Sequence, residues 1–427
     1  MRRVRASDSR AILLTMSRTL SPLAYRALGR VLVAVAPVWR WWLGRTAHVT
    51  FIGVTGSAGK TTTTRLLPAM LEGAGPVAQT DRLVGQLNEV QLVARLVLST
   101  RARHRFAVFE MGTGGPGIIR RFIKVLRPQS GVVTNINGDH FTAFRSLEET
   151  AKEKGQVVES LPPTGVAVLN ADDARVLAMA SRTRARVLTY GIASPTAEVR
   201  GEAVSGAWPD RVSMTVVMGD ARVHVRTRLV GEHFATHVLA ALATATAAGV
   251  PLADAAKAIE QQEPADGRCS VHEVDGITFI RDDWKAPLWS LAAAIRFMET
   301  ARAPRRIMVI GTISDYPGAR SRKYRAVARQ AVAAVDHVFF VGPAAAGTNF
   351  DLPPEQLTVF ETLAELQAHV EHYLQPGDLV MLKGSATADH LQRLVLARDG
   401  GVTCWRRACG RTMFCERCEL RHVAASD

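Results

Sequence analysis

FIGVTGSAGKTTTTRLL (residues 51–67) decides the fold, because an apolar strand runs through a loop of small residues into a threonine-rich helix. This order is typical of a phosphate-binding loop, in which backbone N–H groups and the helix dipole face the phosphate. The usual spacing places a glycine where this chain has Val54, so the loop is a shorter form that begins at Gly56. The alternative is a Gly-rich turn with a solvated lysine. The strand–loop–helix context favours a nucleotide site.

Individual roles follow from the chemistry of this loop. Lys60 is expected to neutralise the β- and γ-phosphates, and the hydroxyl of Thr61 suits Mg²⁺. The remaining residues expected to bind the nucleotide are Gly56, Ser57, Ala58, Gly59 and Thr62.

The rest of the chain alternates short apolar strands with segments of helix length, which predicts an α/β fold. A period-two segment at 211–230 predicts a hairpin, and QQEPADGR (261–268) has the composition of a linker. We predict a P-loop central domain with a mostly parallel sheet, a smaller Rossmann-like α/β domain and a short Cys-rich tail. The predicted boundaries are an extension at 1–47, the central domain at 48–264, the second domain at 265–400 and the tail at 401–427.

The extension at 1–47 is strongly basic, and much of the net charge of +14 lies there. It contains nine arginines against one acid, Asp8, and its apolar stretch at 31–44 is too short to span a bilayer. Two interpretations stay open: an amphipathic helix that covers the flank of the first domain, or one that lies on an anionic membrane surface. Nucleic-acid binding is disfavoured. We expect a cytoplasmic protein, either free or peripheral at the inner membrane surface.

Further motifs follow the loop in order. They are QLNEV (86–90), FEMGTGGPG (109–117), TNINGDHFTAFRSLEETAKEKGQVV (134–158) and LPPTGVAVLNADD (161–173). Together they resemble the Mur ligase family, the ATP-dependent amide-forming ligases of peptidoglycan and folate metabolism. In the central domain the resemblance is closest to the branch that adds D-Ala-D-Ala.

The resemblance implies roles that the residues alone do not show. Glu110 would bind Mg²⁺, His140 would be a second metal ligand, and Lys154 would be the lysine that the family carbamoylates. Asn170 would lie at the nucleotide, and Arg268 would be the catalytic arginine at the start of the last domain. Taken singly, a carboxylate at a strand end is as often a cap, and lysines on a helix are often only solvated.

The resemblance also implies a reaction. A substrate carboxylate would attack the γ-phosphate of ATP, and a small-molecule amine would displace phosphate from the resulting acyl phosphate. One alternative is a synthetase subunit that takes ammonia from a partner glutaminase. Another is a nucleotide-binding scaffold that has lost ligation.

The chain departs from the family pattern at two places. Phe234 and His237 replace asparagines that lie near the adenine in the family. In IRDDWKAPLWSL (280–291), one register assigns ribose binding to Asp283 and the other to Asp282, and we prefer Asp283.

Four of the five cysteines lie at the end of the chain, at Cys404, Cys409, Cys415 and Cys418. Their spacing predicts one structural zinc ion, with free or redox-active thiols as the alternative. The fifth, Cys269, is expected to be a buried apolar residue.

Overall fold

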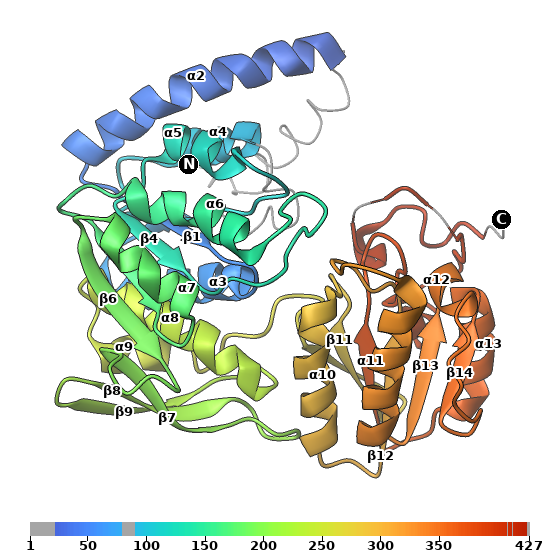
Figure 1. Ribbon diagram of the computed structural model, residues 1–427. Coiled ribbons are helices and arrows are strands. Elements are labelled where there is room, and N and C mark those ends of the chain that lie inside the picture. The colour runs from blue at the N-terminus through green and yellow to red at the C-terminus, as the bar shows by residue number, and fades with distance from the viewer. Residues whose placement is uncertain (1–21, 79–89, 408, 412, 425–427) are drawn as a thin grey trace, which may run out of the picture.

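The computed structural model describes residues 22–78, 90–407, 409–411 and 413–424, and these form two α/β domains (Figure 1). The prediction of an α/β fold with a P-loop domain and a smaller second domain is confirmed. QLNEV falls almost wholly outside the described residues, as do residues 1–21 of the basic extension.

The first domain is built on a nine-stranded sheet in the order β2-β3-β1-β4-β5-β6-β7-β8-β9. Neighbouring strands are parallel from β2 to β7, and β7, β8 and β9 are antiparallel. The strands are β1 (Thr50–Thr55), β2 (Val77–Ala78), β3 (Phe106–Glu110), β4 (Ser130–Val133), β5 (Val166–Asn170), β6 (Arg186–Gly191), β7 (Val199–Ser205), β8 (Ser213–Met218) and β9 (Ala221–Arg226). The predicted hairpin at 211–230 is therefore present as β8 and β9.

Both faces of this sheet are covered, which is why its central strands read as continuous apolar runs. Phe51 of β1 contacts one core cluster, and its neighbour Ile52 contacts the other. The first cluster includes side chains from α2 (Pro22–Thr46), α4 (Val90–Ser99) and α5 (Ile118–Leu126). The second includes α3 (Lys60–Leu71), α8 (Ala235–Ala247) and α9 (Leu252–Ala258). Helices α6 (Leu147–Glu159) and α7 (Ala174–Leu177) complete the domain.

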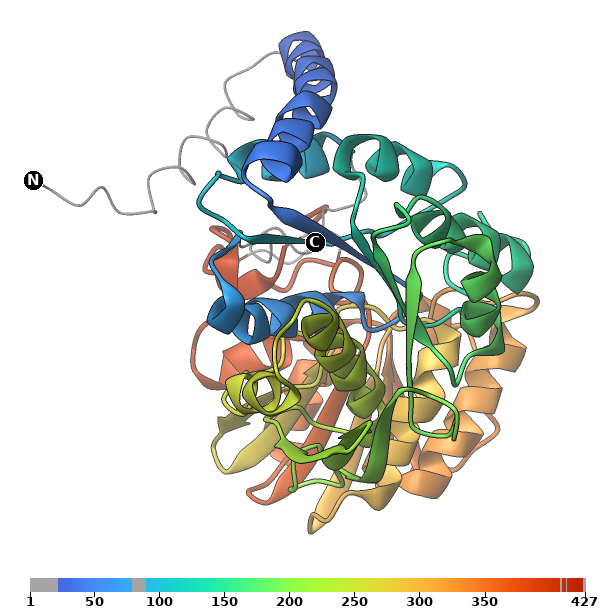
Figure 2. The ribbon, with the colours of Figure 1, turned by 90° about the vertical axis from the view of Figure 1, so that its left-hand side faces the viewer.

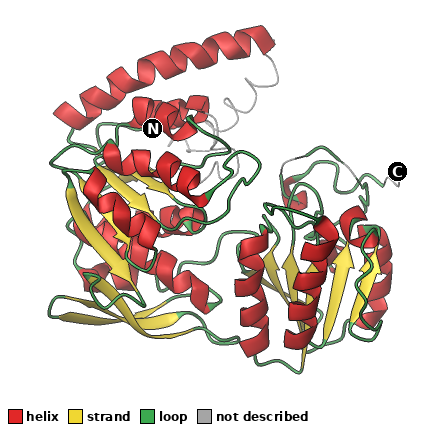
Figure 3. Ribbon diagram, in the orientation of Figure 1, coloured by secondary structure: helices red, strands yellow, loops and turns green. Residues whose placement is uncertain are grey.

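The second domain has a six-stranded sheet in the order β10-β11-β15-β12-β13-β14, antiparallel only between β10 and β11. Its strands are β10 (Ser270–Val274), β11 (Ile277–Asp282), β12 (Arg305–Ile310), β13 (His337–Val341), β14 (Leu357–Phe360) and β15 (Asp378–Lys383). Helices lie on both faces (Figure 3). They are α10 (Leu288–Thr300), α11 (Arg320–Ala334), α12 (Pro343–Ala346), α13 (Leu363–Tyr373) and α14 (Arg393–Arg398).

Helix α2 covers the flank of the first domain, as one interpretation of the extension predicted. It lies on the outside of α4 and α5 (Figures 1 and 2), with Ala36 and Leu43 fully buried against them. The Trp39 indole donates to the carbonyl of Thr100 at 3.0 Å, and Arg40 Nε donates to that of Leu126 at 2.8 Å. Among the described helices, none is long and apolar enough to cross a membrane.

Candidate functional site

The phosphate-binding loop joins β1 to α3 in the conformation that its glycines allow. Gly59 has a φ of 79°, a left-handed value at which a side chain is strained. Its neighbour is His237, and a Cβ on Gly59 would lie 2.2 Å from the imidazole Cδ2. At Gly56 a Cβ would lie 1.8 Å from Thr134 Oγ1. Only glycine fits either position, so the loop backbone is held close to the surrounding side chains.

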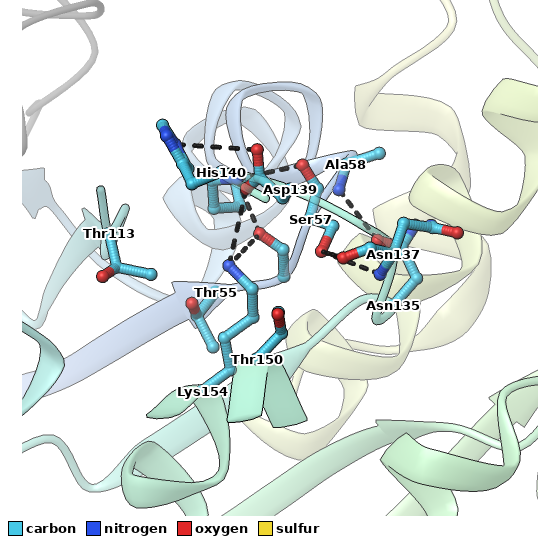
Figure 4. Close-up of polar contacts among 12 residues, drawn as sticks. Thr55, Ser57, Ala58, Thr113, Asn135, Asn137, Asp139, His140, Thr150 and Lys154 are labelled. Atoms are coloured by element: carbon cyan, nitrogen blue, oxygen red, sulfur yellow. Dashed lines mark hydrogen bonds and ion pairs between the residues drawn. The ribbon is translucent and has the colours of Figure 1, made fainter. Parts of the chain in front are cut away.

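The segment after β4 fixes the loop in place. Ala58 N donates to Asn135 Oδ1 at 2.8 Å, and Ser57 N donates to the Asn135 carbonyl at 2.9 Å. Asn137 N donates to Ser57 Oγ at 2.9 Å (Figure 4). Asn170 Nδ2 in turn donates to the Thr134 carbonyl at 2.8 Å, so its amide supports this segment from the end of β5. Hydrogen bonds within the protein thus fix the conformation of the loop.

Asp139 is the acidic centre of the site, although no prediction from the sequence gave it a role. Its Oδ1 lies 3.1 Å from Lys285 Nζ. Its Oδ2 lies 3.7 Å from Lys154 Nζ (Figure 4). Burial alone would raise the pKa of this carboxyl, but the charges of Lys60, Lys154 and Lys285 lower it to about 2. Asp139 is therefore ionised at neutral pH. The sequence feature that could have pointed to Asp139 is its position directly before His140 in the motif TNINGDH.

Lys154 projects from α6 into this centre and is fully buried. Its Nζ donates to the Gly56 carbonyl at 3.0 Å. Burial, and then the positive charge of Lys60, lower the pKa of the Lys154 amine to about 7. A lysine side chain ordinarily stays protonated to well above neutral pH. The fraction of the Lys154 amine that is uncharged at neutral pH is therefore much larger than usual.

Three of the four predicted magnesium ligands, Thr61, Glu110 and His140, line the same cavity, whereas Lys154 is buried behind its lining. Thr61 Oγ1 donates to Glu110 Oε2 at 2.8 Å, and His140 Nε2 lies 3.6 Å from Asp139 Oδ1. Burial lowers the pKa of His140, so its imidazole is neutral at neutral pH. Within the part of the chain that the structure describes, no three His, Cys, Asp or Glu side chains are arranged to hold a metal ion. Mg²⁺ commonly takes one or two protein oxygens and completes its shell with phosphate and water, which suits a hydroxyl beside a carboxylate.

The second domain contributes the opposite wall of the cavity. Lys285 reaches across to Asp139 and also pairs with Asp315 at 2.9 Å. Lys383 Nζ donates to Asp282 Oδ2 at 2.5 Å, and both residues line the cavity. The carboxyl ends of β11 and β15 therefore face those of β1 and β4.

The sequence favoured Asp283 over Asp282 as the ribose ligand, whereas the geometry favours Asp282. Asp283 is fully buried, and its carboxylate faces the Arg281 guanidinium at 3.4 Å, away from the cavity. Successive side chains of an extended segment point to opposite sides, so only one of the two aspartates could line the cavity. That residue is Asp282.

The cavity between the domains has a volume of about 530 Å³, a size typical of small-molecule sites. The loop, Glu110, Asp139 and His140 form its polar part. Aromatic side chains also line the cavity: Phe234, His237, Trp284 and Trp289. Of these, His237 lies directly against Gly59 of the loop. Phe234 and His237 meet edge to face with ring centroids 5.6 Å apart. Burial lowers the pKa of His237 to about 3, so this ring is uncharged.

The remaining predicted residues also lie at the cavity. Lys60 folds back over its own loop, with Nζ 2.6 Å from the Gly56 carbonyl. Arg268 stacks over the Trp284 ring at 5.9 Å. The other predicted loop residues and Asn170 line the cavity too: Ser57, Ala58, Gly59, Thr61, Thr62 and Asn170. The structure thus brings together all the predicted nucleotide residues except Gly56, whose carbonyl lies behind the loop, and Asp283.

The cysteines of the tail lie around a separate cavity of about 10 Å³, beside His390 and Arg393. Cys409 Sγ is 3.1 Å from His390 Nε2, and Arg393 Nε donates to Cys415 Sγ at 3.3 Å. All five cysteines, including the buried Cys269, are free thiols. The described side chains hold no group of three metal ligands in the tail, so the structure gives no support to the zinc prediction.

The same tail packs against the loop that carries Asp282. Phe414 meets the Trp284 ring at 5.2 Å, and a Cβ on Gly267 would lie 2.7 Å from Phe414 Cζ. Glu416 bonds to Arg281, whose guanidinium also faces Asp283. The tail thus supports the nucleotide side of the second domain from behind, a contact that no sequence motif predicted.

Comparisons with known proteins agree with this geometry. Residues 54–245 match the family model "Mur ligase middle domain", and residues 267–386 match "Mur ligase, glutamate ligase domain". The two matches together span most of the chain.

Individual relatives point to one branch. The chain is 32% identical over 254 residues to a UDP-N-acetylmuramoyl-tripeptide–D-alanyl-D-alanine ligase of Mycobacterium bovis. This matched stretch covers 58% of this chain and 48% of that protein. A protein of the same name from Treponema pallidum is 26% identical over 357 residues, or 80% of this chain and 73% of that protein. The crystal structure of MurF from Acinetobacter baumannii superimposes with a TM-score of 0.77 at 25% identity, over 87% of this chain and 80% of that one. The chain spans about half the length of the mycobacterial relatives.

Proposed function

Because the chain belongs to the Mur ligase family, we propose that it is an ATP-dependent ligase that joins a carboxylate to an amine through an acyl phosphate. The observation that carries the proposal is the convergence of Lys60, Glu110 and the Asp139–Lys154 pair around one cavity shared by both domains. Phosphoryl transfer needs cations placed where negative charge develops, and this cavity offers them from opposite walls.

Residues in different parts of the cavity would bind different parts of ATP. The backbone of Gly56–Gly59 and the start of α3 would hold the phosphates, and Lys60 would offset their charge. Asp282 would bind the ribose hydroxyls, and the aromatic side chains that line the cavity would hold the base by stacking. Lys285, held by Asp139 and Asp315, faces the phosphate end from the second domain.

Mg²⁺ fits the oxygen donors at Thr61 and Glu110, and the neutral His140 imidazole lines the same cavity. When bound, the ion would neutralise charge on the transferring phosphoryl group.

We further propose that Lys154 is carbamoylated. Three lysines (Lys60, Lys154 and Lys285) surround the single carboxylate of Asp139. A neutral amine adds CO₂ and releases a proton, and the resulting carbamate would convert Lys154 into an anion. The four groups would then carry two positive and two negative charges. The lowered pKa of Lys154 supplies the neutral amine that this reaction needs.

In the proposed reaction an oxygen of the substrate carboxylate forms a bond to the γ-phosphorus, and ADP leaves. The amine nitrogen then attacks the acyl carbon, phosphate leaves with that oxygen, and the amine loses a proton. By analogy with its relatives, we propose a cell-envelope peptide as the acceptor and D-alanyl-D-alanine as the first amine to test.

The decisive experiment uses a carboxylate substrate labelled with ¹⁸O. The full chain is supplied with ATP, Mg²⁺, an acceptor panel that includes UDP-N-acetylmuramoyl-tripeptide, and a panel of amines that includes D-alanyl-D-alanine and ammonium. We expect amide product and one ¹⁸O atom in the released phosphate, and neither with Lys60→Ala.

Other outcomes identify the alternatives. Turnover with ammonium but with no amino acid or dipeptide would indicate a synthetase subunit fed by a glutaminase. Nucleotide binding without turnover of any pair would favour a scaffold that has lost ligation. Product without ¹⁸O in phosphate would contradict the acyl phosphate.

A further inference from the structure

Helix α2 has two apolar faces, and only one of them packs against other residues that the structure describes. The inner face buries Ala36 and Leu43 against α4 and α5. On the same side a Cβ on Gly29 would lie 2.5 Å from the Gln91 side chain, so the helix backbone is in close contact with the start of α4. The helix is therefore firmly docked, and the orientation of its outer face is determined by the fold.

The outer face exposes large apolar side chains along one line. Their exposed fractions are 57% for Val31, 49% for Val35, 66% for Val38, 54% for Trp41 and 39% for Trp42. Steps of three and four residues keep them on one side of a helix. In the described residues only four other large apolar side chains are exposed to this degree: Leu177, Ile192, Met413 and Val423. A docked surface helix normally presents polar residues to water, so this stripe needs an occupant.

The charge of α2 restricts what that occupant can be. The helix contains four arginines and no aspartate or glutamate. Arg30 and Arg45 are exposed at either end of the stripe. The Trp42 ring is held by stacking on Trp39, with centroids 4.9 Å apart. Tryptophan and arginine beside an apolar stripe are the composition of helices that lie in the interface of an anionic bilayer.

A second copy of the chain fits this surface less well. A symmetric contact between two α2 helices would bring their arginines together, and neither helix has an acid to pair with them. Like charges would then oppose the apolar contact. An anionic lipid surface has the opposite sign and accepts both the apolar side chains and the arginines.

We propose that the outer face of α2, defined by Val31, Val35, Val38, Trp41 and Trp42, docks this protein on an anionic membrane surface. The helix lies in the headgroup region with its axis along the surface, because the apolar stripe follows that axis. The inner face stays on α4 and α5. This inference does not depend on the proposed ligase activity, since it uses no residue of the cavity.

The test is co-sedimentation of the full chain with vesicles. Wild type is compared on phosphatidylcholine vesicles and on vesicles with equal parts of phosphatidylglycerol and phosphatidylcholine. We expect binding to the anionic vesicles, and a loss of about tenfold or more for the double variant Val38→Ser/Trp41→Ser, because two exposed apolar side chains no longer enter the interface. The matched control is Leu177→Ser/Ile192→Ser, which removes apolar side chains exposed elsewhere and should bind as wild type does.

Two further measurements make the result decisive. Residues 1–21 are the same in every variant, so their arginines cannot account for a difference between them. All variants should keep the melting temperature and the ATP-induced thermal shift of wild type, because both changed side chains point outward. Equal vesicle binding by wild type and Val38→Ser/Trp41→Ser, or no binding to anionic vesicles, would overturn the proposal. So would a wild-type dimer in light scattering that the double variant converts to a monomer.

Discussion

Lys154 shows how far a single residue is changed by its surroundings. In the sequence it belongs to a charged helix segment, AKEK, in which Lys152 is exposed. In the structure Lys154 is the one of the two that turns inward, beside Asp139 and the Gly56 carbonyl. Burial and the charge of Lys60 then lower its pKa to about 7. The same residue type is thus exposed to solvent at one position and, two positions later, buried with a lowered pKa.

The lowered pKa predicts a pH-dependent response to bicarbonate. Raising the pH through about 7 increases the neutral fraction of Lys154, so carbamoylation and turnover at limiting bicarbonate should rise together over that range. Lys154→Arg keeps the positive charge but cannot form a carbamate, so its activity should fall by about 100-fold or more. The measurement is phosphate release at several pH values, with ¹³C-bicarbonate NMR to detect the carbamate.

Lys152→Arg is the matched control, because Lys152 lies on the exposed side of α6. It should leave both the carbamate resonance and the pH response unchanged. A resonance that persists in Lys154→Arg would contradict the assignment.

At the scale of elements, two short segments decide the shape of the nucleotide site. One is the turn between β1 and α3, where Gly59 meets His237. The other is the tail, where Phe414 and Glu416 support the segment after β11. The first is visible in the sequence because a phosphate loop has a fixed pattern. The second has no local pattern, because it joins residues far apart in the chain: Arg281 and Glu416 are 135 positions apart.

Gly59→Ala should abolish nucleotide binding. The added methyl group meets the His237 ring at 2.2 Å, and the φ of 79° is itself unfavourable for alanine by about 1–2 kcal/mol. The matched control is Gly219→Ala in the β8–β9 turn, where φ is 57° but no atom lies within 4 Å. Both substitutions introduce similar backbone strain, but only Gly59→Ala brings a methyl group against another side chain. Isothermal titration with ATP should therefore show loss of binding only for Gly59→Ala. ATP affinity in Gly59→Ala equal to that of wild type would show that the loop can rearrange.

Phe414→Ala should raise the KM for ATP roughly fivefold with little change in kcat, because an aromatic pair behind Trp284 contributes about 1 kcal/mol. Glu416→Gln should act in the same direction by weakening the bond to Arg281. The control is Met413→Ala in the same segment, since Met413 is 43% exposed. A fall in kcat without a change in KM would contradict a positioning role for the tail.

At the scale of the whole molecule, the cavity exists only because two domains meet. The Asp139–Lys285 ion pair crosses from the first domain to the second, and Asp139 is only 5% exposed. Charges in such an environment depend on their partners much more than charges on the surface do. The domain arrangement and the charge balance of the site are therefore coupled.

Asp139→Asn should lower the free energy of unfolding by about 3 kcal/mol, because it leaves buried lysines without their shared carboxylate. It should also reduce the ATP-induced rise in melting temperature, which depends on both walls of the cavity. The control is Asp210→Asn, which breaks an exposed pair with Arg302 and should cost less than about 1 kcal/mol. Chemical denaturation and thermal shift provide the two readouts, and equal destabilisation by both variants would contradict the buried role of Asp139.

The sequence by itself determined the α/β class, the phosphate loop, the hairpin and the family, and the structure and comparisons confirm these. Each depends on residues close together in the chain, where hydrogen-bonding geometry and side-chain periodicity limit the conformations. The zinc site in the tail found no support. The structure places Asp282 rather than the preferred Asp283 at the cavity, because register within a short extended segment depends on which face is buried.

Only the tertiary structure decided the central place of Asp139, the low pKa of Lys154, the contact of the tail with Trp284 and the second apolar face of α2. These properties arise from burial and from charges brought together across the sheet and between domains. Desolvation and Coulomb interactions depend on distance in space, which the order of residues does not specify.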